Sequence, residues 1–144
     1  MPLGAAKTLS SILSVALLAS TFAHALCSVD EVVIKGRVDH PASATKVRVQ
    51  LIYARGVVGE SGETTIENGG FTIAIEFLTQ SRRPVVNGIL EKCKRRPSTV
   101  IVTLVEGARE QEYDRVTLDF AKDFKMADSS AYSLRSELAL NGSR

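Results

Sequence analysis

A cluster of basic residues is the most unusual chemical feature of the sequence. Six cationic side chains fall within 15 residues, and only Glu91 opposes them. These residues, which we name the basic cluster, are Arg82, Arg83, Lys92, Lys94, Arg95 and Arg96. If its two parts, residues 82–83 and 92–96, lie side by side, they form a patch for phosphate, sulfated sugar or an acidic protein surface. The alternative is that these residues flank turns and keep one edge of the fold soluble.

Histidine chemistry depends on His40, because His24 lies in a segment that we expect to be removed after export. His40 follows Asp39, and a catalytic triad needs an acid that faces the imidazole. Neighbours on an extended strand point to opposite sides, so Asp39 is poorly placed for that role. One histidine and two cysteines also make a poor tetrahedral metal site. We therefore predict that His40 is an exposed loop residue, and we predict no catalytic residue, no metal site and no cofactor.

Carboxylates gather in the last third of the chain. They are Glu106, Glu110, Glu112, Asp114, Asp119, Asp123 and Asp128. They lack the regular spacing with a central glycine that wraps a loop around Ca²⁺. Nothing marks two of them as the facing pair that glycosidic cleavage needs. A solvated acidic loop is the simplest interpretation, and a small extracellular hydrolase or inhibitor that uses these carboxylates is the alternative.

Residues 1–25 have the pattern of a cleavable secretory signal peptide. Lys7 precedes an apolar stretch over residues 9–23, and Ala23 and Ala25 occupy the two positions that a signal peptidase inspects. As a helix this stretch would rise only about 22 Å, which is less than the ~30 Å hydrocarbon core of a membrane. We therefore predict a secreted, extracellular protein that is not inserted in a membrane once the signal is removed.

Two cysteines remain after cleavage, Cys27 and Cys93. In an exported protein the default is that such a pair forms a disulfide. A bond closing a loop of this length would stabilise the fold by roughly 4 kcal/mol in the chain-entropy model. It would also tie the mature N-terminus to the basic cluster. Two unpaired thiols or an intermolecular bridge are the alternatives.

The charge balance limits the partners. The formal net charge of the chain is +2, which gives no general attraction to nucleic acid or to an anionic membrane. We therefore predict no nucleic-acid partner. Asn141-Gly142-Ser143 matches the N-glycosylation sequon, so Asn141 is a candidate modification site in a eukaryotic host.

Alternation of apolar and polar residues is the main signal of secondary structure, and it has a period of two. Residues 46–53, 71–77 and 132–140 alternate, while residues 98–105 are apolar on nearly both faces, as in a central strand. Asn68-Gly69 suits a tight turn and predicts a β-hairpin over residues 63–77. Two places could be short helices instead of strands, residues 85–93 and 120–126. About seven strands are predicted. The sequence thus predicts an all-β, Ig-like antiparallel sandwich as a single domain over residues 26–144.

Part of this pattern resembles a known group of sandwiches. Ile34-Lys35-Gly36-Arg37-Val38, the alternating strand from Lys46 to Leu51, and Gly69-Gly70-Phe71-Thr72-Ile73 follow one another in the chain. This order is similar to the opening strands of transthyretin-like and carboxypeptidase-regulatory-like domains. The resemblance covers residues 31–77 and implies the fold and secretion.

The activity of that group does not carry over. Hydroxyisourate hydrolases of this fold have several histidines and end in Tyr-Arg-Gly-Ser, whereas this chain ends Leu-Asn-Gly-Ser-Arg. A fold alone does not define a function. No hormone-binding site is carried over either.

These observations favour a secreted, non-enzymatic binding module that presents loops and a basic edge to an extracellular protein or acidic polysaccharide. Within this class the chain resembles small secreted effector proteins of plant-associated fungi, which engage a host protein or the cell wall. Two alternatives to this binding module stay open: the small hydrolase or inhibitor described above, and a self-associating surface or matrix component.

Overall fold

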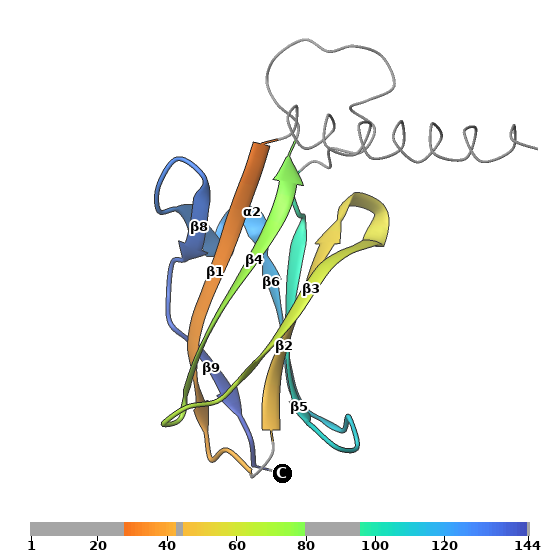
Figure 1. Cartoon of the computed structure of the whole chain (residues 1–144), viewed down its shortest axis with the longest axis vertical. Helices are drawn as coiled ribbons and strands as arrows, with labels where there is room; N and C mark the ends of the chain where they lie inside the picture. Colours follow the sequence, from red (N-terminus) through yellow and green to blue (C-terminus); the bar gives the residue numbers. More distant parts are fainter. Residues whose placement is uncertain (1–27, 43–44, 80–95, 144) are drawn as a thin grey trace, which may run out of the picture. The chain divides into compact units, whose positions relative to one another are not determined.

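The computed structural model describes residues 28–42, 45–79 and 96–143 (Figure 1). Nearly all of them belong to one compact unit, Val29–Phe77 with Arg95–Arg144. A second unit, Met1–Ser28 with Leu78–Lys94, is described only at Ser28, Leu78 and Thr79. There, the Thr79 hydroxyl donates to the Ser28 carbonyl at 3.4 Å.

Several sequence predictions concern residues outside the described ranges. They are the signal peptide over residues 1–25, the Cys27–Cys93 disulfide, the helix over residues 85–93 and five of the six residues of the basic cluster. Those five are Arg82, Arg83, Lys92, Lys94 and Arg95. Only Arg96 of the cluster is described.

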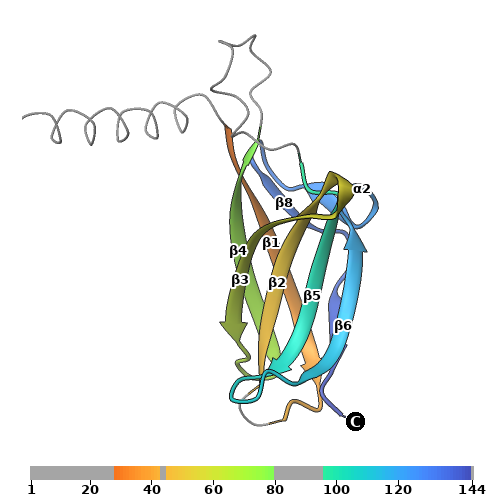
Figure 2. The ribbon, with the colours of Figure 1, turned by 90° about the vertical axis from the view of Figure 1, so that its right-hand side faces the viewer.

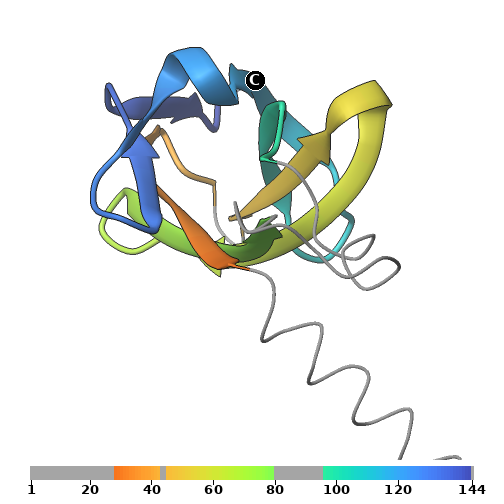
Figure 3. The ribbon, with the colours of Figure 1, turned by 90° about the horizontal axis from the view of Figure 1, so that it is seen from above.

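Two sheets face each other across the core of the described unit (Figures 2 and 3). In the first sheet the order is β4 (Gly70–Thr79), β1 (Ser28–Asp39), β8 (Ala131–Leu134) and β7 (Phe124–Met126), and β9 (Leu138–Asn141) also pairs with β1. In the second sheet the order is β3 (Val57–Thr65), β2 (Thr45–Tyr53), β5 (Thr99–Glu106) and β6 (Glu112–Asp119). The described part therefore confirms a mostly β, two-sheet sandwich.

The core is built from the alternating residues that the sequence indicated. The apolar residues on the inner faces of β2 and β4 are buried: Val47, Val49, Leu51, Tyr53, Phe71, Ile73, Ile75 and Phe77. They meet side chains of β1 and β5 in one apolar cluster. β5 lies between β2 and β6, as predicted for a central strand. Burial of these apolar side chains is thus the main force that holds the two sheets together.

The predicted topology is wrong in strand number and direction. The described residues contain nine strands rather than about seven, and β1 pairs in parallel with both β8 and β9. One predicted strand over residues 132–140 is divided because residues 135–137 leave the ladder. At that break the Arg135 N–H donates to the Asp123 carbonyl at 2.8 Å and the Arg135 Nε to the Phe124 carbonyl at 3.1 Å. The long strand β1 then offers separate segments to β8 and β9.

The predicted hairpin over residues 63–77 is confirmed at its turn and wrong beyond it. Asn68 and Gly69 have positive φ values of 51° and 73°, and Glu67 and Gly70 form a bridge. The strands on either side then join different sheets, β3 with β2 and β4 with β1. Only β4 then buries apolar side chains in the core, because β3 has no buried residue and its two valines, Val57 and Val58, are exposed.

The segment over residues 120–126 is part helix and part strand. α2 (Phe120–Asp123) is a single turn, after which β7 begins. The Asp119 carboxylate accepts hydrogen bonds from the Ala121 and Lys122 N–H groups at 3.0 Å each, which is an N-cap. A short η1 turn (Ala54–Gly56) links β2 to β3.

Gly36 is a packing constraint that substitution can test. A Cβ atom at Gly36 would lie 2.6 Å from Phe71 Cζ and 2.7 Å from the Leu138 carbonyl oxygen. We expect Gly36→Ala to lower the free energy of unfolding by about 1–3 kcal/mol through overpacking. The measurement is thermal and denaturant unfolding followed by circular dichroism.

Gly62→Ala is the matched control for this prediction. A Cβ atom there would lie 3.3 Å from the flexible end of Ile73. Its free energy of unfolding should stay within about 1 kcal/mol of the parent, since a strand alanine also restricts the unfolded chain. Equal losses in the two variants would contradict the packing at Gly36.

Candidate functional site

The described end of the basic cluster lies against the aromatic part of the core. The guanidinium carbon of Arg96 is 5.4 Å from the centroid of the Tyr132 ring, a cation–π geometry. Arg96 is exposed, whereas Tyr132 on β8 is 5% exposed. A residue that the sequence marked only by its charge is therefore held at a defined position on the fold.

Tyr132 belongs to a cluster of four aromatic rings. Phe120 and Phe124 stack with centroids 5.3 Å apart, and Phe120 is 5.0 Å from Tyr132. Phe77 meets Phe120 edge to face at 6.1 Å. The single turn α2 makes this cluster possible, because it begins at Phe120 and is followed by Phe124, so that the two rings lie against each other.

A pocket of about 570 Å³ opens beside these rings. Its lining combines three aromatic and three cationic side chains, and we name it the aromatic–basic pocket. The six residues are Phe120, Phe124, Tyr132, Arg96, Lys125 and Arg135. The cations come from three separate segments: the one that precedes β5, the strand β7, and the break after β8.

The charge of the aromatic–basic pocket is mainly positive. Arg135 is fixed at its position because its Nε donates to the Phe124 carbonyl at 3.1 Å. Asp119 also lines the pocket, but its carboxylate already caps α2. Two arginines and a lysine at one place favour carboxylate, sulfate or phosphate groups.

The Tyr132 hydroxyl is buried and has no hydrogen-bond partner among the described residues. A buried hydroxyl without a partner costs about 1–3 kcal/mol of desolvation. The Tyr53 hydroxyl provides the contrast, because it donates to Glu60 Oε2 at 2.5 Å. Burial, and then this hydrogen bond, raise the pKa of Tyr53 well above its ordinary value. Tyr132 thus lines the pocket and carries a buried donor without a partner among the described residues.

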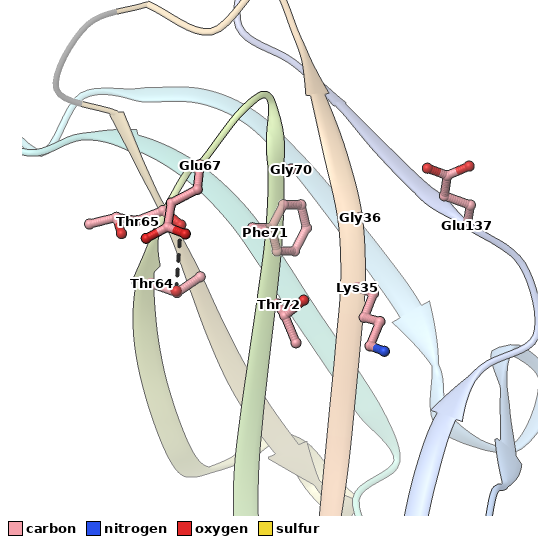
Figure 4. Close-up of a pocket in the computed structure, with 9 residues that line it drawn as sticks. All are labelled: Lys35, Gly36, Thr64, Thr65, Glu67, Gly70, Phe71, Thr72 and Glu137. Carbon is pink, nitrogen blue, oxygen red and sulfur yellow. Dashed lines mark hydrogen bonds between the residues drawn. The ribbon is translucent and has the colours of Figure 1, made fainter.

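A second pocket, of about 580 Å³, has a polar lining drawn from β1, β3, β4 and the break between β8 and β9 (Figure 4). Thr64, Thr65 and Glu67 lie on one side of Phe71, and Glu137 stands apart on the far side of β1. The Thr64 hydroxyl donates to the neighbouring Thr65 carbonyl at 3.5 Å. Since its charged groups do not converge on one point, this pocket is the weaker candidate.

The acidic residues of the last third are engaged in local contacts. Glu110 pairs with Arg48 at 2.8 Å, Glu112 pairs with Arg115 at 3.1 Å, and Asp114 accepts from the Asn141 N–H at 2.8 Å. Asp123 and Asp128 accept from the N–H groups of Asp119 and Ser130. Within the described ranges, no three His, Cys, Asp or Glu residues lie close enough to hold a metal ion.

His40 and Asn141 both lie at strand ends. His40 is exposed and has a φ of 55°, as predicted for a loop residue after the first strand, while Asp39 pairs with Arg37 at 3.4 Å. Asn141 is exposed, and its Oδ1 accepts from the Ser143 N–H at 2.9 Å and hydroxyl at 2.7 Å. Glycosylation of Asn141 stays a prediction.

Sequence reasoning did not find three residues of the aromatic–basic pocket, Lys125, Tyr132 and Arg135. Tyr132 was identified as a strand residue, but its missing hydrogen-bond partner is a property of the packed core. Lys125 and Arg135 are isolated cations in the sequence, with no motif around them. They meet Arg96 only through the fold.

Comparison with known proteins gives no relative. No family model, no curated protein and no solved structure matches the chain. The resemblance to transthyretin-like domains therefore stays a prediction. None of the helices in the described ranges is long and apolar enough to cross a membrane.

The unmet hydroxyl gives a stability prediction. We expect Tyr132→Phe to keep or raise the free energy of unfolding, by up to about 1 kcal/mol, because it removes a buried polar atom without breaking a hydrogen bond. Tyr53→Phe, the matched control, should lower it by a similar amount because the bond to Glu60 is lost. Chemical denaturation at neutral pH measures both. Destabilisation by Tyr132→Phe as large as that by Tyr53→Phe would show that the hydroxyl has a partner.

An ionic network on β2 and β3 gives a pH prediction. The hydrogen bond from Lys46, and then that from Arg48, hold the pKa of Glu63 below its ordinary value. This contribution to stability is therefore present above the ordinary pKa of a glutamate and is lost as pH falls through the lowered pKa. In Glu63→Gln, the midpoint temperature of unfolding should therefore fall less between neutral pH and about pH 3 than it does in the parent.

Glu67→Gln serves as the control for this prediction. Glu67 is exposed and forms no ion pair in the described part of the chain. The pH profile of this variant should match that of the parent. Identical profiles for the parent and Glu63→Gln would contradict the role of the network.

Proposed function

We propose that the protein is a secreted, non-enzymatic binding module that engages an acidic extracellular macromolecule, either a protein or an acidic polysaccharide. The observation that carries this proposal is the meeting of Arg96, from the basic cluster, with Lys125 and Arg135 at the aromatic–basic pocket. Extracellular location rests on the signal-peptide pattern of residues 1–25. A narrower role as an effector rests on small size and predicted export.

Two properties of the pocket support this proposal: its positive charge, and the fixed positions of its two arginine side chains. Arg96 packs on Tyr132, and Arg135 is tethered to the Phe124 carbonyl, so part of the entropy of ordering these long side chains is already lost in the unbound protein. Guanidinium groups also form bidentate hydrogen bonds with carboxylate and sulfate oxygens. Arg48, in contrast, is already paired with both Glu63 and Glu110 at 2.8 Å. The pocket therefore offers cations that are in place for an outside partner.

Neutralising two of these cations tests the proposal. We expect Arg96→Gln/Lys125→Gln to weaken binding to acidic polysaccharide or to a captured acidic protein at least about tenfold, because two charge-assisted hydrogen bonds are lost. Retention on a heparin column and pull-down with the purified protein are the measurements. Arg135 is left unchanged because its Nε also holds the backbone.

The control is Arg55→Gln/Arg109→Gln, which removes the same charge from exposed positions outside the pocket. This variant should elute close to the parent. Equal weakening of the two double variants would show that only net charge matters, and no weakening of either would contradict the proposal. Circular dichroism confirms that each variant is folded.

A further inference from the structure

We infer that the aromatic–basic pocket binds a small aromatic acid, a planar ring that carries a carboxylate or sulfonate, and that the Tyr132 hydroxyl donates to the acid group. The inference rests on the proposed function for the roles of Arg96 and Lys125. It adds the chemical class of a ligand and a residue that recognises it.

The walls of the pocket select for a ring. Phe120 and Phe124 stack at an interplanar angle of 19°, while Phe120 and Tyr132 meet at 55°. These three rings are 3–5% exposed, so a ligand ring packs against their exposed edges, and each aromatic pair is worth more than its buried area alone. The volume of about 570 Å³ is within the range of small-molecule sites. Met126, which is 53% exposed, adds an adaptable apolar surface.

The rim of the pocket selects for an anion. Arg96, Lys125 and Arg135 line it, and the carboxylate of Asp119 is already used to cap α2. A ligand anion beside an apolar wall is shielded from water on one side, which strengthens its attraction to these cations. A neutral ring would leave the three cations without an anionic partner in the complex.

Tyr132 supplies the specific contact. Its hydroxyl has no partner in the described structure, and the Arg96 guanidinium lies over its ring. A ligand carboxylate that draws Arg96 off the ring gives the ligand ring access to Tyr132 and gives the hydroxyl an acceptor. Sites with a polar group waiting for a ligand atom discriminate strongly against analogues that lack this atom. The ligand thereby provides the hydrogen bond that the buried Tyr132 hydroxyl lacks in the unbound protein.

The aromatic acid and the acidic macromolecule make different demands on the pocket. A polyanion without rings needs only the cations, whereas the aromatic acid needs the cations, the rings and the hydroxyl. Tyr132→Phe separates the two, because it leaves every charge in place. We expect this variant to keep its retention on heparin and to bind the aromatic acid more weakly.

Calorimetric titration of the purified full chain with three probes tests the inference. The probes are 2-naphthoate, the neutral analogue 2-naphthalenemethanol, and acetate, an anion without a ring. We expect 2-naphthoate to bind at least about tenfold more tightly than either of the others, since each lacks one class of contact. Tyr132→Phe should weaken 2-naphthoate several-fold, and Arg96→Gln/Lys125→Gln at least about tenfold. Tyr53→Phe and Arg55→Gln/Arg109→Gln should not change it.

Three results would overturn the inference. They are equal affinity for 2-naphthoate and 2-naphthalenemethanol, unchanged affinity for 2-naphthoate in Arg96→Gln/Lys125→Gln, and no binding of 2-naphthoate at all. If the parent still binds acidic polymer through Arg96 and Lys125 in the last case, the proposed function stands and only the aromatic ligand is wrong. If 2-naphthoate binds as expected but the polymer does not, the macromolecular partner is wrong and the small-ligand site stands.

Discussion

The packing of four aromatic rings determines most of what is distinctive in this protein. The rings come from four elements: Phe77 from β4, Phe120 from α2, Phe124 from β7 and Tyr132 from β8. The centroid of each ring lies within 6.3 Å of the centroid of at least one other. The cluster joins the β4 strand to the last third of the chain in one end of the core. It also forms the wall against which Arg96 rests, so the core and the candidate site share the same side chains.

This sharing explains why the candidate site is compact although its cations are far apart in the chain. Arg96 precedes β5, Lys125 lies on an edge strand, and Arg135 lies where the chain leaves the ladder after β8. The aromatic rings bring these three segments to one place, and α2 and the Arg135–Phe124 hydrogen bond keep them there. The hydroxyl of Tyr132 is the one polar atom of this core cluster, and its lack of a described partner is what separates the site from ordinary packing.

The sequence predicted the parts of the fold that depend on local periodicity. The faces of β2 and β4, the central position of β5, the turn at Asn68-Gly69 and the loop position of His40 are examples. It did not predict the parallel pairing of β1 with β8 and β9, because strand pairing depends on contacts that are distant in the chain. It found Arg96 by charge density, but not Lys125, Arg135 or Tyr132. Their roles arise from register, from a one-turn helix and from an unmet hydrogen bond, none of which leaves a pattern in the sequence.

Binding at the aromatic–basic pocket is the property on which the proposed function depends. The most direct measurement is a map of backbone amide shifts by two-dimensional ¹H–¹⁵N NMR during titration of the protein with a heparin-derived oligosaccharide. We predict the largest changes at residues 96–98, 119–126 and 131–136, with the polar pocket around Thr64 and Glu67 unaffected. Changes centred on that polar pocket, or spread evenly over all exposed cations, would contradict this account.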